Sequence, residues 1–310
     1  MGYVDWLAAG GNSAGSISKM RNSMKILLNA DDLGYHADVN TGVLHAHQNG
    51  IIRSTSLMIR GEAVLDVVQL AKDAPNLEIG LHFNVTSGQC CAKPNKIPLL
   101  ADETGTFRFD STNMPAFIAR LRTLVSSEKQ FLDQIEREFW AQVEQFHHLG
   151  LTPRHLDIHH YINLVHINLF SQYVGFANQL AIPFRGLCYP ILQMMRIPAG
   201  IEAEMQGLVR ESRVPAPEVS ISNLLGSRLS KIPDSPEYER MVEIELEKLA
   251  NSGVKSVEFV THPAHISPAF RDKDDYVWAR ELETALVNSI SFAGYLERNN
   301  HCIITHAELR

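Results

Sequence analysis

The apolar run Ile26-Leu27-Leu28-Asn29-Ala30 is followed by two adjacent acids, Asp31 and Asp32, and by Gly34. An apolar run that ends in two acids and a tight turn predicts a strand whose end lies at the rim of a sheet, where ligands collect in α/β folds. Side chains alternate along an extended strand, so the two carboxylates are expected to point in different directions and to serve different purposes. The alternative is that one of them caps a helix that begins near Ala37.

From Lys25 onward, short apolar runs alternate with helical patterns, as in repeated βα units. Strands are expected at residues 25–29, 52–58, 77–83, 154–158, 182–185, 219–222, 256–260 and 302–305. Helices are expected at residues 39–49, 62–73, 114–125, 128–149, 167–179, 236–252 and 274–299, the last with a break near Gly294. The count, close to eight of each, predicts an α/β fold. We expect a (β/α) barrel of the TIM type that is distorted or has fewer than eight strands.

A single domain is expected to span residues 25–310, because this length and apolar fraction suffice for one large core. Residues 1–24 are interpreted as a flexible leader or an added extension, with Met24 as an alternative start. Two turn-rich segments, near residues 86–113 and 187–234, are expected to be loop insertions that form walls or lids of a pocket.

The charge balance of 28 basic and 35 acidic residues, a net charge of −7, argues against nucleic acid and anionic membrane surfaces as partners. The sequence contains no run of about 18 apolar residues, so no membrane span is expected. The four cysteines (Cys90, Cys91, Cys188 and Cys302) show neither metal-site spacing nor a disulfide framework, which favours a reducing, cytoplasmic location. The oligomeric state stays open, with a homodimer as one option.

Several predicted strands end in histidine or aspartate, and in a barrel all of these ends lie on one face. They are Asp31 and Asp32 after the first strand, His82 in the third, His155, Asp157, His159 and His160 around the fourth, and His262 after residues 256–260. Residues more than 200 positions apart could therefore converge in one pocket.

Two imidazoles and one carboxylate suit a catalytic divalent metal, because three protein ligands leave positions open for water and substrate. We expect Asp32, His82 and His159 to form this set. Since neighbouring side chains alternate in direction, His155 and His160 cannot reach the same ion.

The remaining polar candidates are His155, Asp157, His160 and Arg185, which are expected to contact substrate or to support the ligands. For Arg185 the alternative is a buried ion pair with Asp31 or Asp157.

A lone histidine at a strand end is more often structural than a ligand. Four strand ends that carry histidine or aspartate on one face together favour a functional site. Histidines within predicted helices are excluded from it: His45 and His47 are assigned to surface or packing, and His147 and His148 to the C-terminus of a long helix.

The motifs themselves resemble a known family. They are residues 29–34 (NADDLG), 39–43 (VNTGV), 54–58 (STSLM), 80–86 (GLHFNVT), 155–160 (HLDIHH) and 261–263 (THP). In this order they are similar to those of the YdjC-like carbohydrate deacetylases, the family of chitooligosaccharide deacetylase. The resemblance runs from about Lys25 to the end and is weak between about Leu187 and Asp234.

The resemblance implies a barrel-like fold, one bound divalent metal and removal of N-acetyl groups from a small-molecule sugar substrate. It places the metal on Asp32, His82 and His159, and it implies that Asp31 acts as the base and His262 as the acid. Such ligands accept zinc, cobalt, manganese, iron or magnesium, with magnesium and zinc expected first.

The chain departs from the family pattern at Tyr161 and Asn163, where the family often has histidine. This leaves the substrate preference open, and with it the sugar, its chain length and the linkage. A hydrolase of another amide or ester, or a non-catalytic sugar- or metal-binding barrel, stays an alternative. A glycosidase is disfavoured because its two carboxylates flank a bond, whereas Asp31 and Asp32 are adjacent.

Overall fold

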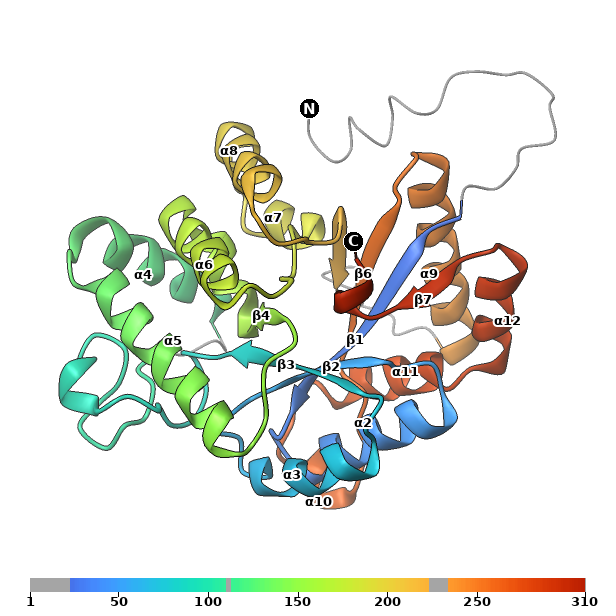
Figure 1. The fold of residues 1–310 in the computed structure, drawn as a ribbon, viewed down its shortest axis with the longest axis horizontal. Coiled ribbons are helices and arrows are strands. Elements are labelled where there is room, and N and C mark those ends of the chain that lie inside the picture. Colours follow the sequence, from blue (N-terminus) through green and yellow to red (C-terminus); the bar gives the residue numbers. More distant parts are fainter. Residues whose placement is uncertain (1–22, 110–112, 223–233, 310) are drawn as a thin grey trace.

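The computed structural model describes residues 23–109, 113–222 and 234–309, which form an α/β fold with a curled parallel sheet surrounded by helices (Figure 1). Nearly all of the expected leader, residues 1–22, lies outside the described residues, as do residues 223–233 of the second turn-rich segment. Among the described residues, no helix is long and apolar enough to cross a membrane.

The strands of the described chain are β1 (Lys25–Leu33), β2 (Ser54–Leu57), β3 (Glu78–Phe83), β4 (Leu156–Ile158), β5 (Val219–Ser222), β6 (Ser256–Thr261) and β7 (Cys302–Ile304). The α-helices are α2 (Ala37–Asn49), α3 (Val64–Asp73), α4 (Met114–Ser127), α5 (Phe131–His148), α6 (Ile167–Leu180), α7 (Tyr189–Met194), α8 (Ala199–Glu211), α9 (Ser235–Asn251), α10 (Pro268–Arg271), α11 (Val277–Val287) and α12 (Ile290–Arg298). Short 3-10 helices are η1 (Pro94–Lys96), η2 (His159–Val165) and η4 (His306–Glu308).

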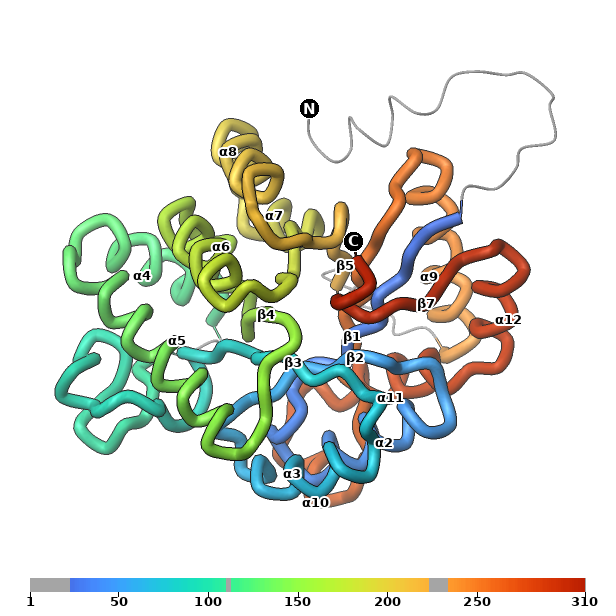
Figure 2. Tube along the Cα trace, in the orientation of Figure 1, coloured from blue at the N-terminus to red at the C-terminus, as the bar shows by residue number. Residues whose placement is uncertain are grey.

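Strand β1 lies at the centre of the sheet, in the order β4-β3-β2-β1-β6-β5 with every pairing parallel. All of its residues after Lys25 are buried, as expected for a strand covered on both faces. The C-terminal strand β7 pairs with the first residues of β1, Lys25 to Leu27, while β2 pairs with β1 only from Asn29 onward. Figure 2 shows the two ends of the described chain, blue and red, running side by side there. The barrel-type fold is therefore confirmed in a distorted form.

The segment that follows α6 closes the gap between the two edge strands without forming a strand. Phe184 makes an isolated bridge to Leu156 of β4, and Cys188 makes one to Ser220 of β5. The predicted strand at residues 182–185 is wrong, because Pro183 lacks the N–H that a continuous ladder needs.

Two further predictions are corrected in the C-terminal half. The single helix expected at residues 274–299 is two helices, α11 and α12, separated at Ser289 rather than at Gly294. The Ser289 hydroxyl accepts a hydrogen bond from the Phe292 N–H (3.2 Å), which starts a new helix. The segment near residues 187–234, expected to be loop apart from a strand at residues 219–222, also contains the helices α7 and α8, and β5 confirms the expected strand.

Helix α2 supports the loop that follows β6. The Asp38 carbonyl accepts a hydrogen bond from the His265 N–H (2.8 Å), and Gly42 lies directly against the backbone of Ala264. A Cβ at position 42 would overlap that backbone, whereas one at Gly175 in α6 would meet no heavy atom within 4 Å.

We expect Gly42→Ala to lower the free energy of unfolding by about 1–3 kcal/mol, because the added methyl must displace backbone. Gly175→Ala is the matched control and should raise it by roughly 0.5–1 kcal/mol through helix propensity. Urea titration followed by circular dichroism measures both. Equal effects at the two positions would contradict the close packing of α2 on this loop.

Candidate metal and catalytic site

All five residues of the predicted metal and catalytic set line one cavity of about 510 Å³ at the C-terminal ends of the strands. They are Asp31 and Asp32 from β1, His82 from β3, His159 directly after β4 and His262 directly after β6. Ser87 from the first turn-rich segment and Met114, the first residue of α4, also line this cavity, as do Ile191 and Met194 from the second segment.

A bulge in β1 turns the two aspartates into this cavity. Ala30 pairs with Thr55 and Leu33 with Leu57, so β1 contains one residue more than β2 over the same span. Asp32 takes up the difference with a φ of 70°. The expected alternation along a regular strand is therefore broken at this point. The alternative role as a helix cap is wrong, because His36 caps α2.

Asp32, His82 and His159 form a group that could hold a metal ion, with one ligand atom of each within 4.8 Å of the others. His82 Nε2 and His159 Nδ1 lie 3.5 Å and 3.4 Å from Asp32 Oδ1, and the two nitrogens face each other at 3.1 Å. Oδ1 of Asp32 is buried without a hydrogen-bond partner. A buried, unpaired carboxylate oxygen beside two imidazole nitrogens fits a divalent cation.

The surroundings of the two histidines favour a cation at this point. Asp157 Oδ1 lies 2.7 Å from His82 Nδ1, which leaves Nε2 to face Asp32. Burial alone would lower the pKa of His82, but Asp157 and Asp31 raise it to about 10, so positive charge is favoured at this ring and a bound cation would take the place of its proton. Burial lowers the pKa of His159, which favours the neutral ring that a metal requires.

Asp31 is held by a different partner, Arg185. Nη1 donates to Oδ2 at 2.8 Å and Nη2 donates to Oδ1 at 2.7 Å, and the Asn29 amide also donates to Oδ1 at 2.7 Å. Burial alone would raise the pKa of Asp31, but the Arg185 charge and then His82 hold it well below its usual range. Asp31 is therefore ionised at neutral pH. Arg185 is fully buried, so it forms an ion pair and does not line the cavity.

His262 is oriented by a carboxylate that sequence reasoning missed, Glu283 of α11. Its Oε2 accepts a hydrogen bond from the His262 backbone N–H at 2.7 Å and lies 3.0 Å from Nδ1. Burial alone would lower the pKa of His262, but Glu283 outweighs it and raises the pKa. The imidazole is thus favoured in its protonated form.

Arg280, three residues earlier on α11, was also missed. Its Nη2 donates to Asp32 Oδ2 at 2.8 Å and its Nε donates to Asp274 at 2.9 Å. With Oδ2 occupied by Arg280, Oδ1 is the oxygen left to face the histidines. The spacing of an arginine and a glutamate at i and i+3 was the only sequence signal, and it is common on exposed helix faces.

The residues after β4 have separate roles. His160 is held by Thr86 (Nδ1 to Oγ1, 2.9 Å), and burial lowers the pKa of His160 to about 2, so it is neutral. His160 and Tyr161 both adopt left-handed backbone, with φ of 58° and 52°, and both line the cavity. Asn163 is buried and does not line the cavity. His155 is fully buried and stacks on His306 (3.7 Å), so substrate contact does not fit its position.

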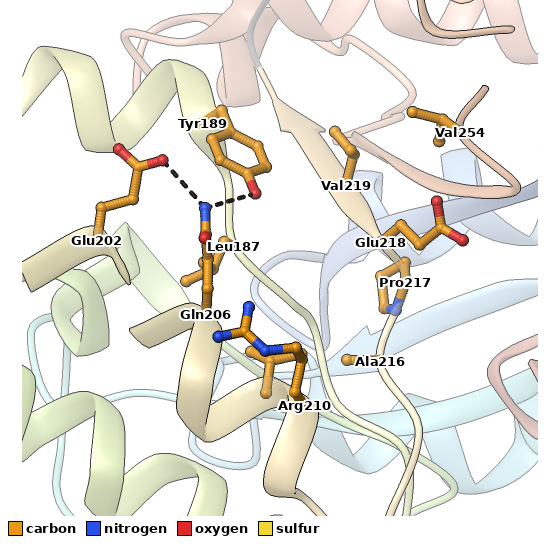
Figure 3. A pocket seen from close by; sticks show the side chains of 11 residues that line it. Leu187, Tyr189, Glu202, Gln206, Arg210, Ala216, Pro217, Glu218, Val219 and Val254 are labelled. Atoms are coloured by element: carbon orange, nitrogen blue, oxygen red, sulfur yellow. Dashed lines mark hydrogen bonds between the residues drawn. The ribbon is translucent and has the colours of Figure 1, made fainter. Parts of the chain in front are cut away.

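A second cavity, of about 450 Å³, lies between α8 and the start of β5 (Figure 3). The amide of Gln206 bonds to the Tyr189 hydroxyl and to Glu202 there. Its lining residues include no histidine or cysteine, and they belong to none of the metal-type groups found in the described chain. The histidines and aspartates suited to holding a metal therefore line the first cavity.

A comparison with known protein families identifies the family of this chain. A profile of the YdjC-like proteins matches residues 25–298. This chain belongs to the YdjC-like family. The match covers the residues that line the first cavity, from Asp31 to Arg280.

Relatives of similar length are named carbohydrate deacetylases. One from Geobacillus stearothermophilus is 29% identical over 282 residues, which cover 91% of this chain and 96% of the relative. One from Brevibacillus brevis is 27% identical, over 92% of this chain and 100% of the relative. An Enterococcus faecalis V583 protein, provisionally named a cellobiose-phosphate cleavage protein, superposes with a TM-score of 0.74 at 21% identity, over 93% of this chain and 99% of that one. This last likeness shows the fold.

We expect His82→Ala and His159→Ala each to weaken cation binding by at least about 10- to 100-fold. Losing a residue that only supports a ligand already costs that much, and these two would be ligands themselves. His262→Ala, in the same cavity but outside the group, is the control and should keep its cation. Metal content after dialysis, measured by mass spectrometry, compares the three. Unchanged content in both ligand variants would contradict this assignment.

Proposed function

We propose that this chain is a metal-dependent hydrolase that removes the N-acetyl group from an acetylated amino sugar or chitooligosaccharide. The observation that carries the proposal is the division between the two adjacent aspartates. Asp31 is ionised and accepts two hydrogen bonds from Arg185, while an unpaired oxygen of Asp32 faces His82 and His159. The names of the relatives support the same reaction, and magnesium or zinc is the proposed cation.

The reaction needs a proton acceptor and a proton donor on either side of the amide. A divalent cation on Asp32, His82 and His159 would acidify a bound water and polarise the acetyl carbonyl. Asp31 takes the proton of the attacking water as the new O–C bond forms at the acetyl carbon. Because its partners keep Asp31 ionised but weakly basic, it suits a water that has already been acidified.

His262 completes the reaction from the other side. Its Nδ1 faces Glu283, which leaves Nε2 for the substrate. Protonated His262 donates to the sugar nitrogen as the C–N bond breaks, and acetate and the free amine leave. The cavity of about 510 Å³ lies in the usual range for small-molecule sites.

We expect Asp31→Asn to lower acetate release from N-acetylated chitooligosaccharides by about 10²–10⁴-fold, since the base is lost. Its metal content should match the unmodified protein, because Asp31 is outside the ligand group. The unmodified protein, stripped with a chelator and reloaded, is the control. Full activity in Asp31→Asn would show that Asp31 is not the base, and no acetate from the reloaded protein would favour a non-catalytic binding barrel.

We expect Glu283→Gln to shift the alkaline limb of the pH–rate profile to lower pH. Activity requires protonated His262 and falls as pH rises through its pKa. Glu283 raises the pKa of His262, so replacing its carboxylate with a neutral amide lowers that pKa, and activity is lost at a lower pH. The measurement is kcat against pH for both proteins. An unmoved alkaline limb would contradict the role of His262 as the acid.

A further inference from the structure

Arg185 contacts three buried carboxylates, more than one guanidinium can neutralise. Besides its two bonds to Asp31, its Nη2 donates to Asp157 Oδ2 and its Nε donates to Glu258 Oε1, both at 2.9 Å. Asp157 has a second partner in His82, whose Nδ1 lies 2.7 Å away. Glu258 is fully buried on β6 and needs a comparable partner, because an unpaired buried charge is costly.

That partner comes from the C-terminus of the chain. His306 is fully buried, and its Nε2 lies 3.5 Å from Glu258 Oε1. The pairing of β7 with β1 leads the chain to this point, and Glu78 of β3 accepts the backbone N–H groups of His306 and Ala307 at 3.0 Å and 3.2 Å. Burial alone would lower the pKa of His306, but Glu258 and Glu78 raise it to about 9. The His306 ring thus lies between two carboxylates, with Nδ1 3.3 Å from Glu78 and Nε2 3.5 Å from Glu258, and this position favours its charged form.

A metal ion is a poorer explanation of this cluster. Glu78, His155 and His306 lie close enough to hold one. The two rings, however, stack with centroids 3.7 Å apart and planes within 12°. Nitrogen lone pairs lie in the ring planes, so two nearly parallel planes cannot direct them at one ion. A charged His306 stacked on a neutral His155 fits this geometry, and burial lowers the pKa of His155.

We propose that His306 is a positioning residue for hydrolysis: its charge holds Glu258 against Arg185, and Arg185 in turn fixes Asp31. The contacts run from His306 through Glu258 Oε1 to Arg185 Nε, and from the other end of the guanidinium to Asp31. The catalytic consequence rests on the proposed function, whereas the state of Arg185 and His306 does not.

The kinetic test compares His306→Gln and Glu258→Gln with His155→Gln, a control from the same buried stack that contacts neither Glu258 nor Arg185. We expect the first two to lower kcat roughly 10- to 100-fold, as loss of supporting partners does elsewhere, with little change in KM or metal content. The control should keep its kcat. Unchanged kcat in a folded His306→Gln, or an equal loss in His155→Gln, would overturn the proposal.

A second test needs no measurement of activity. Nitrogen-15 NMR of the unmodified protein should show both His306 ring nitrogens protonated at pH 7, and a neutral ring would overturn the proposal even if His306→Gln fails to fold. Exchange of the Arg185 Nε–H with solvent should accelerate in Glu258→Gln. Absence of acetate from the unmodified protein would count against the proposed function alone, because these NMR results still decide the role of His306.

Discussion

Arg185 contacts three buried carboxylates, and these contacts connect three strands of the barrel to Asp31, the proposed base. These carboxylates, Asp31, Asp157 and Glu258, stand on β1, β4 and β6, and Arg185 itself lies in the segment that bridges the edge strands β4 and β5. Removing one partner from such a buried ionic group generally costs about 3–5 kcal/mol, because a charge is left without compensation. Barrel closure and the ionised state of Asp31 therefore depend on the same side chain.

The two adjacent aspartates differ because each has its own arginine. Arg185 takes both oxygens of Asp31, whereas Arg280 takes only Oδ2 of Asp32 and leaves Oδ1 facing two histidines. Helix α11 carries Arg280 and, one turn later, Glu283, so one helix orients both Asp32 and His262. Two carboxylates next to each other in the chain thus acquire different chemistry from their surroundings.

The fold and the centre of the site could be predicted from local patterns. The alternation of apolar runs and helices indicates parallel strands, and residues at the ends of such strands must share a face, which brings His82 and His159 near Asp32. Prediction failed where a single residue overrides the pattern. Pro183 interrupts a strand, and Ser289 restarts a helix within an apparently continuous one. Asp32 breaks the alternation of β1 through a bulge that only its pairing with β2 reveals.

Local patterns in the sequence set where the strands fall along the chain and which residue types stand at their ends, because burial and backbone periodicity act over a few neighbouring residues. Which distant side chains support these residues follows only from the assembled fold. Arg280 lies 248 positions from Asp32, and His306 lies far from Arg185 in sequence, and neither carries a local pattern that marks its partner. Such pairings depend on how the strands close and on which buried charges must be compensated, and these are properties of the assembled barrel.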